Sequence, residues 1–389
     1  MTKHAPPQTC VELLQQMVSF NTVNRISDGI PFVEGELAEH LESVARGWGL
    51  KAERLEIPGT GFNLLVTRQV DPQLPWLLFD SHMDTVSVEG MTVDPFAGAI
   101  TAGRLYGRGA CDTKASGATM LWALKTLVAE NTPSQNLGIL YTIDEEITRT
   151  GVKTFLRQQL DGLDWKPAAV VVGEPTSCRL VTAHNGTVRW QISTTGRAAH
   201  SSDPSQGRSA ISDMVRVIDA LETQYIPQLD AAHELVGKAQ CSINLISAGT
   251  LINVIPDACT ISVDRRAVPG EDATQVLPAV ESVLESLRRE VPGLCVTQHE
   301  AQIQSSLSPD GNQEFAGHVG GVLRSLGLEE QPLGAKYGTH ASDFASAGFP
   351  AVVLGPGDIA QAHRKDEYIV LDQLEHGIEI YRSVMCAGV

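Results

Sequence analysis

Residues 76–84 read WLLFDSHMD, a short apolar run that ends in a histidine and an aspartate. An apolar run of this length is typical of a buried strand. Four other short apolar runs are strand candidates: FNLLVTR (62–68), GILYTI (138–143), AAVVV (168–172) and PAVVL (350–354). Helix-like stretches separate them, with helices predicted over 114–129 and 371–385. This alternation predicts an α/β domain, built from both ends of the chain, with a mostly parallel mixed sheet flanked by helices.

The middle of the chain has a different order of elements. Its apolar patterns predict a strand at 187–194, a helix at 208–224, strands at 241–247 and 258–264, a helix at 272–290 and a strand at 294–303. The order is βαββαβ, as in ferredoxin-like folds. We therefore expect a discontinuous first domain over 1–186 and 301–389, and an inserted domain over 187–300.

Composition excludes several classes of partner. The 389 residues include 29 Lys plus Arg against 46 Asp plus Glu, a net charge of −17. A surface this acidic repels phosphate backbones and anionic lipids, so we expect no nucleic-acid or membrane partner. No apolar run approaches the roughly 18 residues of a membrane span. The seven cysteines are scattered and never form CxxC, which predicts reduced thiols in a cytoplasmic protein.

Metal-capable side chains follow the predicted strands. Because the carboxyl ends of parallel strands meet at one edge of a sheet, these side chains are expected to gather there. One acidic residue after a strand is most often a helix cap, but several together repel one another unless cations neutralise them. Mixed histidine and carboxylate ligands suit Zn²⁺ better than Mg²⁺. The candidates are His82, Asp84, Asp112, Glu145, Glu146, Glu174 and His363.

Five ordered motifs carry a family resemblance: SHMDTV (81–86), GRLYGRGACDTKASGA (103–118), DEE (144–146), VGEPT (172–176) and AHRKDEY (362–368). Together they resemble the M20 family of co-catalytic zinc amidohydrolases, particularly its acetylornithine deacetylase and succinyl-diaminopimelate desuccinylase branch. The resemblance covers nearly the whole chain.

The resemblance implies two Zn²⁺ per chain, with Co²⁺ or Mn²⁺ as possible substitutes. His82 and Glu174 would hold one ion, Glu146 and His363 the other, and Asp112 would bridge them.

Two further residues of the same motifs have implied catalytic roles. Glu145 resembles the general base that takes a proton from the bridging water and passes it to the leaving amine. Asp84 would accept the free N–H of the His82 imidazole and so fix its tautomer.

The middle segment resembles the lid and dimerisation domain of the family, through GRAAHSSDPSQGRSAI (196–211) and INVIPDACTISVDRR (252–266). The resemblance implies a homodimer in which His200 reaches the partner subunit's site and polarises the scissile carbonyl. Asn253 and Arg266 match substrate-contacting positions. A structural salt bridge is the alternative for Arg266.

The segment YGTHASDF (337–344) resembles the substrate loop of the family. Gly338 and Thr339 would offer donors to a substrate carboxylate. His340 departs from the family pattern, and both specificity tuning and an ordinary hydrogen-bonded loop histidine remain open for it. For His184, packing and a role at a hinge or site remain open.

These observations lead to a hydrolase that cleaves the amide bond of a small N-acyl amino acid by a metal-bound hydroxide, in the manner of acetylornithine deacetylase. The alternatives are desuccinylation of the succinyl-diaminopimelate type, and dipeptidase or carboxypeptidase activity on short peptides. A catalytically inactive metal- or peptide-binding protein of this fold is the non-enzyme alternative. A nicotinamide dehydrogenase is disfavoured because Gly107-Arg108-Gly109 lacks the third glycine of GxGxxG.

Overall fold

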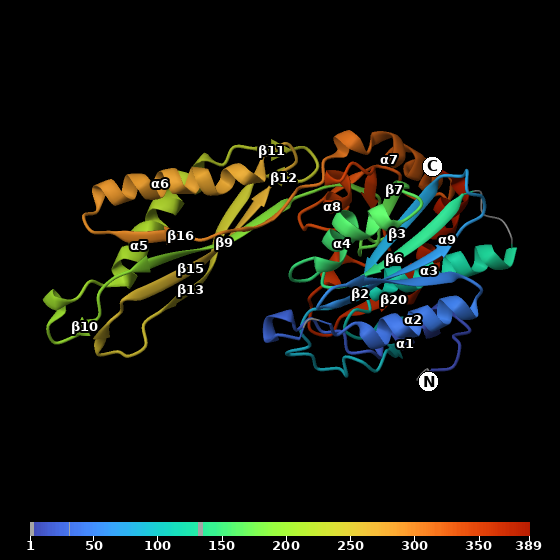
Figure 1. Ribbon diagram of the computed structural model, residues 1–389, viewed down its shortest axis with the longest axis horizontal. Helices are drawn as coiled ribbons and strands as arrows, with labels where there is room; N and C mark the ends of the chain where they lie inside the picture. The colour runs from blue at the N-terminus through green and yellow to red at the C-terminus, as the bar shows by residue number, and fades with distance from the viewer. Residues whose placement is uncertain (1–3, 31, 131–134) are drawn as a thin grey trace. The chain divides into compact units, whose positions relative to one another are not determined.

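The computed structural model describes residues 4–30, 32–130 and 135–389. The chain divides into two compact units (Figure 1). The first runs to Thr182 and resumes over Pro309–Leu333 and Thr339–Val389. The second comprises Ala183–Ser308 and Gly334–Gly338. The chain therefore crosses between the units four times.

A sheet of eight strands forms the centre of the first unit, in the order β1-β2-β6-β3-β7-β19-β8-β18. Its strands are β1 (Lys51–Ile57), β2 (Gly61–Arg68), β3 (Trp76–His82), β6 (Asn136–Thr142), β7 (Pro167–Val172), β8 (Val181–His184), β18 (Leu333–Ala335) and β19 (Ala351–Val353). The neighbours β6, β3, β7 and β19 are parallel, whereas β1, β2 and β8 pair in antiparallel fashion. The predicted mixed α/β sheet is confirmed, with its parallel strands confined to the centre.

Helices cover both faces of this sheet. They are α1 (Cys10–Val18), α2 (Gly35–Gly47), α3 (Lys114–Glu130), α4 (Thr150–Thr154), α7 (Gln313–Ser325), α8 (Ala341–Ser346) and α9 (Leu371–Ala387). Successive side chains of a strand alternate between faces. Leu77 and Phe79 of β3 join the main core with α1, α2, α3, α7 and α9. Asp80 and His82 therefore point to the other face of the sheet, and α8 packs on β7 and β19.

The register of the central strands brings the candidate residues to the same end of the sheet. His82 pairs with Thr142 of β6, and Asp80 pairs with Val172 of β7. The segments that follow β6 and β7 therefore leave the sheet where β3 ends. These segments carry Glu145 and Glu174.

A small sheet joins two distant segments of the first unit. Its strands are β4 (Ala99–Thr101), β5 (Arg104–Tyr106) and β20 (Tyr368–Val370). Tyr368 pairs with Tyr106, so the end of the AHRKDEY motif lies beside the chain that leads to Asp112.

The second unit has its own sheet, in the order β13-β15-β9-β16, with β17 also paired to β9. Its longer elements are β9 (Gly186–Thr195), α5 (Ala210–Ala220), β13 (Gln240–Ala248), β15 (Ala258–Ala267), α6 (Val276–Glu290), β16 (Cys295–Gln298) and β17 (Gln302–Gln304). The short pairs are β10 (Ala199–His200) with β14 (Val254–Ile255), and β11 (Ala232–His233) with β12 (Gly237–Lys238). Strands and helices follow the predicted βαββαβ order. The unit begins before 187, ends after 300, and includes Gly334–Gly338, which the predicted boundaries omit.

The second unit also has a separate core. Ile192 of β9 and Val263 of β15 pack there with Met214 of α5 and Val280 of α6. Across the described residues of both units, no helix is long and apolar enough to cross a membrane.

Candidate metal centre

His82 ends β3 and is 4% exposed. Its Nδ1–H donates to the backbone carbonyl of Asp84 at 2.9 Å. In the neutral imidazole this hydrogen bond would keep the proton on Nδ1 and leave the Nε2 lone pair for a metal. Nε2 lies 3.3 Å from Oδ1 of Asp112.

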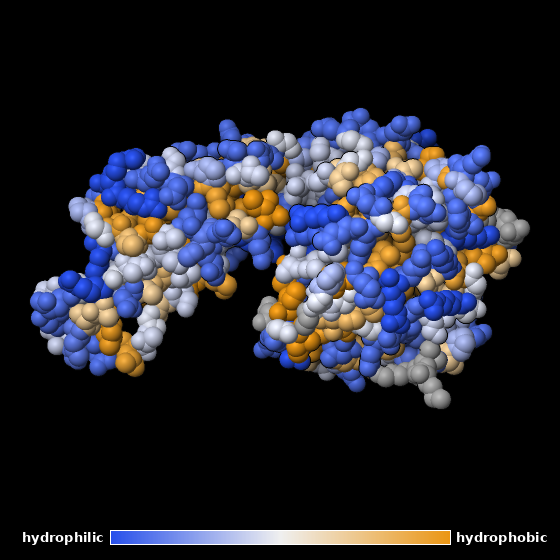
Figure 2. Space-filling model, viewed as in Figure 1, coloured by the Kyte–Doolittle hydropathy of each residue, from blue (hydrophilic) through white to orange (hydrophobic). Residues whose placement is uncertain are grey.

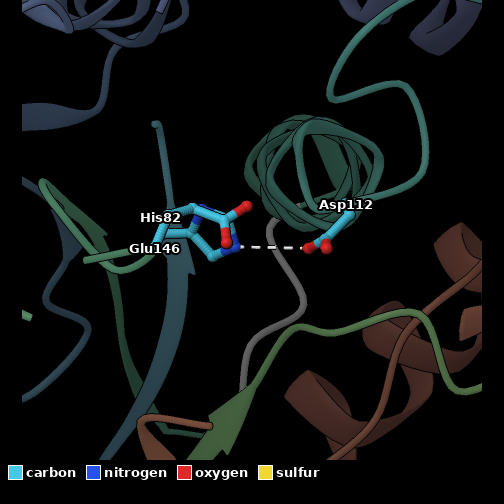
Figure 3. A group of neighbouring side chains, drawn as sticks. All are labelled: His82, Asp112 and Glu146. Carbon is cyan, nitrogen blue, oxygen red and sulfur yellow. Dashed lines mark ion pairs between the residues drawn. The ribbon is translucent and has the colours of Figure 1, made fainter. Parts of the chain in front are cut away.

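Asp112 directly precedes Thr113 and α3, and the peptide bond that joins Asp112 to Thr113 is cis. Figure 3 shows its carboxylate facing His82 and Glu146 from across the site. One ligand atom from each of these three residues lies within 4.8 Å of the others. Three residues from distant parts of the sequence thus form the spacing of a metal site.

His363 completes the other side of this cluster. It follows the short helical turn Ile359–Gln361 and adopts a left-handed backbone conformation with φ 58°. Its Nε2 lies 3.1 Å from Oε2 of Glu146 and 3.5 Å from Oδ2 of Asp112. The two carboxylate oxygens of Asp112 therefore face one histidine each, which is the arrangement that a carboxylate bridging two ions requires.

Glu174 follows β7 and is 6% exposed. Burial raises the pKa of its carboxyl group well above the usual range, and the charge of Asp112 raises it further. His82 acts in the opposite direction. His82, Asp112, Glu146 and His363 are thus linked by distances of 3.1–3.5 Å, and Glu174 belongs to the same unit.

The pKa values of the cluster show strong mutual interactions. Burial raises the pKa of Glu146 to about 7, although its hydrogen bond with His363 works against the shift. That hydrogen bond is also the main reason why the pKa of His363 rises to about 9. Burial lowers the pKa of His82, but Asp112 and Asp84 outweigh it, so that the pKa rises well above normal.

Asp84 holds the turn that carries the two glutamates. Its side chain is fully buried and accepts the backbone N–H of Glu145 at 2.9 Å and that of Glu146 at 3.1 Å. Asn24 donates to both Asp84 and Asp144 at 2.8 Å. The Asp84 carboxylate lies 3.5 Å from Nδ1 of His82, so the backbone carbonyl is the nearer acceptor for that ring. The carboxylate thus acts mainly on the glutamate turn.

Glu145 lies beside this cluster in the chain, and its backbone is fixed by Asp84. Burial raises the pKa of its carboxyl group, while the positive charges of His82 and His340 oppose the rise. A base with a raised pKa accepts protons more readily near neutral pH.

Glu367 is a supporting residue to which the sequence analysis assigned no role. Its buried carboxylate accepts the backbone N–H groups of Gly109, Cys111 and Asp112 at 2.7–3.1 Å. It also pairs with Arg108 at 2.7 Å. Glu367 therefore holds the loop that presents Asp112. It stands in the AHRKDEY motif, but nothing local in the sequence indicates a partner more than 250 residues away.

Two predicted residues of the second unit are neighbours. His200 pairs with Val254 in the β10–β14 ladder, and Ser201 N–H donates to the carbonyl of Asn253 at 3.0 Å. The side chains of His200 and Asn253 are exposed. Nδ1 of His200 lies 2.8 Å from the hydroxyl of Ser202.

Arg266 and Gly338 have different surroundings in that unit. Arg266 stands near the end of β15 and donates from Nε to Asp264 at 2.6 Å. This ion pair is the structural salt bridge that the sequence analysis named as its alternative role. Gly338 packs so closely on Gln304 that an added Cβ atom would lie 2.4 Å from that side chain.

Two residues near the unit boundaries are buried. Thr339, in the first unit, accepts the N–H of Ala341 on its hydroxyl at 3.1 Å. His184 is fully buried, and its Nδ1–H donates to the carbonyl of Asn185 at 2.9 Å, as a packing role requires.

The donor set fits divalent cations. The imidazoles of His82 and His363 face the carboxylates of Asp112 and Glu146. Oε1 of Glu146 is buried with no hydrogen-bond partner among the described residues. A buried carboxylate oxygen without a partner is costly, whereas a metal ligand of this type is ordinary. The mixture of nitrogen and oxygen donors suits Zn²⁺ or a similar transition metal better than Mg²⁺.

Comparison with solved structures agrees with the fold. A metallo-carboxypeptidase of the M20 family from Sulfolobus solfataricus superimposes with a TM-score of 0.81 at 17% identity, covering 98% of this chain and 99% of that one. A dinuclear metal binding peptidase of the M20 family from Bacillus subtilis gives a TM-score of 0.70 at 15% identity, covering 97% and 96%.

Sequence comparison finds relatives of higher identity than these solved structures. An acetylornithine deacetylase of Yersinia pseudotuberculosis serotype O:1b (strain IP 31758) is 31% identical over 352 residues, which cover 87% of each chain. The sequence pattern of peptidase family M20/M25/M40 matches residues 78–387. With the ligand cluster inside the matched region, the chain belongs to peptidase family M20/M25/M40 and is a metal-dependent hydrolase.

Proposed function

We propose that this hydrolase removes the acyl group from an N-acyl amino acid at a site for two metal ions, with an acetyl group as the preferred acyl. The observation that carries the proposal is the placement of Asp112, whose two oxygens lie 3.3 Å and 3.5 Å from the Nε2 atoms of His82 and His363. A single ion would not need a histidine on each side of one carboxylate.

The five proposed ligands would divide into two sets around Asp112. His82 and Glu174 would hold one ion, and Glu146 with His363 the other. Bound there, two divalent cations would polarise the substrate carbonyl and make water more acidic. Both Zn²⁺ and the substitutes Co²⁺ and Mn²⁺ are compatible with these donors.

Glu145 is the proposed base. It accepts a proton from the attacking water, so that an O–H bond of water breaks and one on the carboxylate forms. It then delivers that proton to the nitrogen of the leaving amine as the amide C–N bond breaks. Burial raises its pKa towards neutrality, which suits both steps.

The substrate class rests on the relatives and on the polar groups assigned to the substrate. The Yersinia relative bears the name acetylornithine deacetylase. Gly338 and Thr339 are the proposed donors for the carboxylate of the amino acid, and Asn253 and Arg266 are proposed further contacts. Engagement of Arg266 requires that it share or leave its ion pair with Asp264.

Desuccinylation of the succinyl-diaminopimelate type is the second candidate, and cleavage of dipeptides or carboxy-terminal residues is the third. All three reactions break an amide bond beside a carboxylate and use the same machinery. The choice among the three reactions depends on the size of the acyl pocket. One methylene group changes the free energy of discrimination between two substrates by only about 1–3 kcal/mol.

We also propose a homodimer formed through the second unit. Strand β13 stands at the edge of its sheet and has no strand on its outer side among the described residues. Leu245 and Ile246 of this strand are 68% and 59% exposed, and Ile252 is fully exposed. Apolar atoms also gather near β10 in Figure 2. An exposed apolar edge strand aggregates unless it is covered, and a second copy of the same strand covers it symmetrically.

The proposed dimer would let His200 act on the partner's substrate, where a donor at the developing oxyanion stabilises the transition state. The cytoplasmic location expected from the cysteine pattern stays a prediction.

A hydrolysis screen tests the substrate class. Chain loaded with Zn²⁺ or Co²⁺ should cleave N-acetyl amino acids with kcat/KM at least about tenfold above that for N-succinyl amino acids and dipeptides. Release of the free amine is the measurement. A tenfold preference for either competitor would replace the proposed substrate, and no cleavage of any of the three would contradict the proposed function.

Loading the metal-free chain should release protons. The pKa of His363 is about 9, so its imidazole is protonated at pH 7.5 and must lose that proton to ligate. Metal affinity should therefore increase from pH 7 to pH 9 and level off above it. Calorimetry in buffers of different ionisation enthalpy measures the release. His363→Ala should release fewer protons, and equal release from this variant would remove His363 from the ligand set.

Replacing the proposed base should leave metal binding intact and slow the chemical step. Glu145→Gln keeps the size of the side chain and should retain two metal ions per chain, whereas kcat falls by about 10²–10⁴-fold. Metal analysis and steady-state kinetics on one preparation give both values. Turnover near that of the unaltered chain would rule out Glu145 as the base.

Mixed dimers test the placement of His200. A dimer that pairs a His200→Ala chain with a Glu145→Gln chain contains one intact site if the histidine acts across the interface, so it should recover about half the activity of the unaltered dimer. Each variant alone should be nearly inactive. Absence of recovery in an isolated mixed dimer would place His200 in the site of its own chain.

A further inference from the structure

Asp112, the proposed bridging ligand, is held by a hydrogen bond on each side of its position in the chain. On one side, its own backbone N–H donates to Oε1 of Glu367 at 2.9 Å. On the other side, the hydroxyl of the next residue, Thr113, donates to the backbone carbonyl of Gly173 at 2.6 Å. Each contact ties Asp112 to a different distant segment of the chain.

The carboxylate of Glu367 is fully engaged by the loop that leads to Asp112. Oε1 also accepts the N–H of Cys111 at 2.7 Å, while Oε2 accepts the N–H of Gly109 at 3.1 Å and Nη1 of Arg108 at 2.7 Å. An ionised carboxylate offers about four acceptor sites, so these four donors occupy all of them. Neighbouring backbone N–H groups that point at one anion form an anion-binding concavity. A neutral amide in this place would turn its NH₂ group towards two of the donors, which would then lose their acceptor.

The backbone of Glu367 binds the same loop. Its carbonyl accepts the N–H of Gly107 at 3.0 Å, and the residue that follows begins β20, which pairs with β5. Glu367 stands only four residues after His363. Anchored in this way, Glu367 relates the position of Asp112 to that of His363.

Thr113 makes the corresponding connection to the other proposed ligands. Its side chain is fully buried, and Gly173, whose carbonyl it binds, directly precedes Glu174. The N–H of Gly173 donates to the carbonyl of Asp80 at 2.8 Å, on the strand β3 that ends in His82. Thr113 therefore relates Asp112 to the segment of Glu174 and, through it, to β3.

We propose that Glu367 and Thr113 are positioning residues that each hold the bridging carboxylate in place for one of the two ions. Glu367 serves the ion proposed beside His363, and Thr113 serves the ion proposed beside His82. When one contact is lost, the other still holds Asp112 to its own side, so the effect on metal binding is selective. This inference deepens the proposed function and rests on the proposed division of the ligands into two sets.

Two chains with one ion each allow the two affinities to be measured separately. Glu174→Gln removes a proposed ligand of the ion beside His82, whereas His363→Ala removes one of the other ion, and each change leaves three ligands around the remaining ion. In the Glu174→Gln chain, Glu367→Gln should raise the Kd for Zn²⁺ by about 10–100-fold and Thr113→Val by less than about threefold. In the His363→Ala chain, the two substitutions should exchange their effects. Calorimetric titration in competition with a chelator measures each Kd.

Two matched controls test whether any loss of a nearby hydrogen bond has the same effect. Asp366→Asn alters the neighbour of Glu367, whose carboxylate accepts the N–H groups of Thr92 at 2.7 Å and Val93 at 3.1 Å instead. Thr119→Val removes another fully buried hydroxyl, which donates to a carbonyl within α3 at 2.8 Å. Both controls should change either Kd by less than about twofold. Shifts in the controls as large as those of the test variants would overturn the proposal.

The pattern of the four affinities distinguishes positioning from general loosening. Loosening of the whole site would raise both Kd values alike, because it has no preferred side. Equal effects of Glu367→Gln on the two one-ion chains, or equal effects of Thr113→Val, would therefore overturn the proposal. Absence of any effect would also overturn it.

A measurement on the unaltered chain covers variants that fail to fold. In the metal-free protein, the amide protons of Cys111 and Asp112 should exchange with solvent at least about 100-fold more slowly than those of an unstructured peptide, because Glu367 binds both. Exchange as fast as in such a peptide, followed by NMR, would overturn the proposal. Failure of the proposed function is distinguishable, because a chain that cleaves none of the acylated amino acids would still give these affinities and exchange rates.

Discussion

Repulsion between buried carboxylates is the constraint on which this site depends. Asp84, Asp112 and Glu174 are buried within one small region, and the Glu146 side chain is only 8% exposed. Two like charges 4 Å apart repel by about 4 kcal/mol at the effective dielectric of a protein. Two histidines offset part of this charge, and bound cations would offset the rest. The cluster therefore has the charge balance of a metal site rather than that of a structural ion-pair network.

The carboxylates outside the ligand set are stabilised by a different means. Asp84 accepts two backbone N–H groups and Glu367 accepts three, so fixed dipoles of the chain stabilise both charges, and Arg108 also pairs with Glu367. Hydrogen bonds to an ionised acceptor are the stronger kind. Each carboxylate also orders the loop that it binds, and those loops present Glu146 and Asp112. The same hydrogen bonds thus order the loops and place the proposed ligands.

The ends of the central strands could be predicted from the sequence more readily than the residues that hold the loops of the site. The runs at 76–80, 138–143 and 168–172 are local patterns, and the residues after them were found because parallel strands finish at one edge. The antiparallel strand β1 was not predicted, since its alternation of charged and apolar residues is weak. Glu367 and the Asp80–His340 pair were missed because each joins residues about 255 or 260 positions apart. Such pairs leave no periodicity in the sequence.

The two units contribute different kinds of proposed site residue. The first unit holds those proposed for chemistry, and the second holds most of those proposed for substrate contact. All five predicted ligands and Glu145 belong to the first unit, whereas His200, Asn253, Arg266 and Gly338 belong to the second. The boundary falls at the peptide bond between Gly338 and Thr339, two adjacent residues of the proposed substrate loop. The proposed metal ligands therefore come from the first unit alone, whereas the proposed substrate contacts come from both units. His340 is the second residue after this boundary, and its contact of 2.8 Å with Asp80 ties the resumed chain to β3 of the first unit.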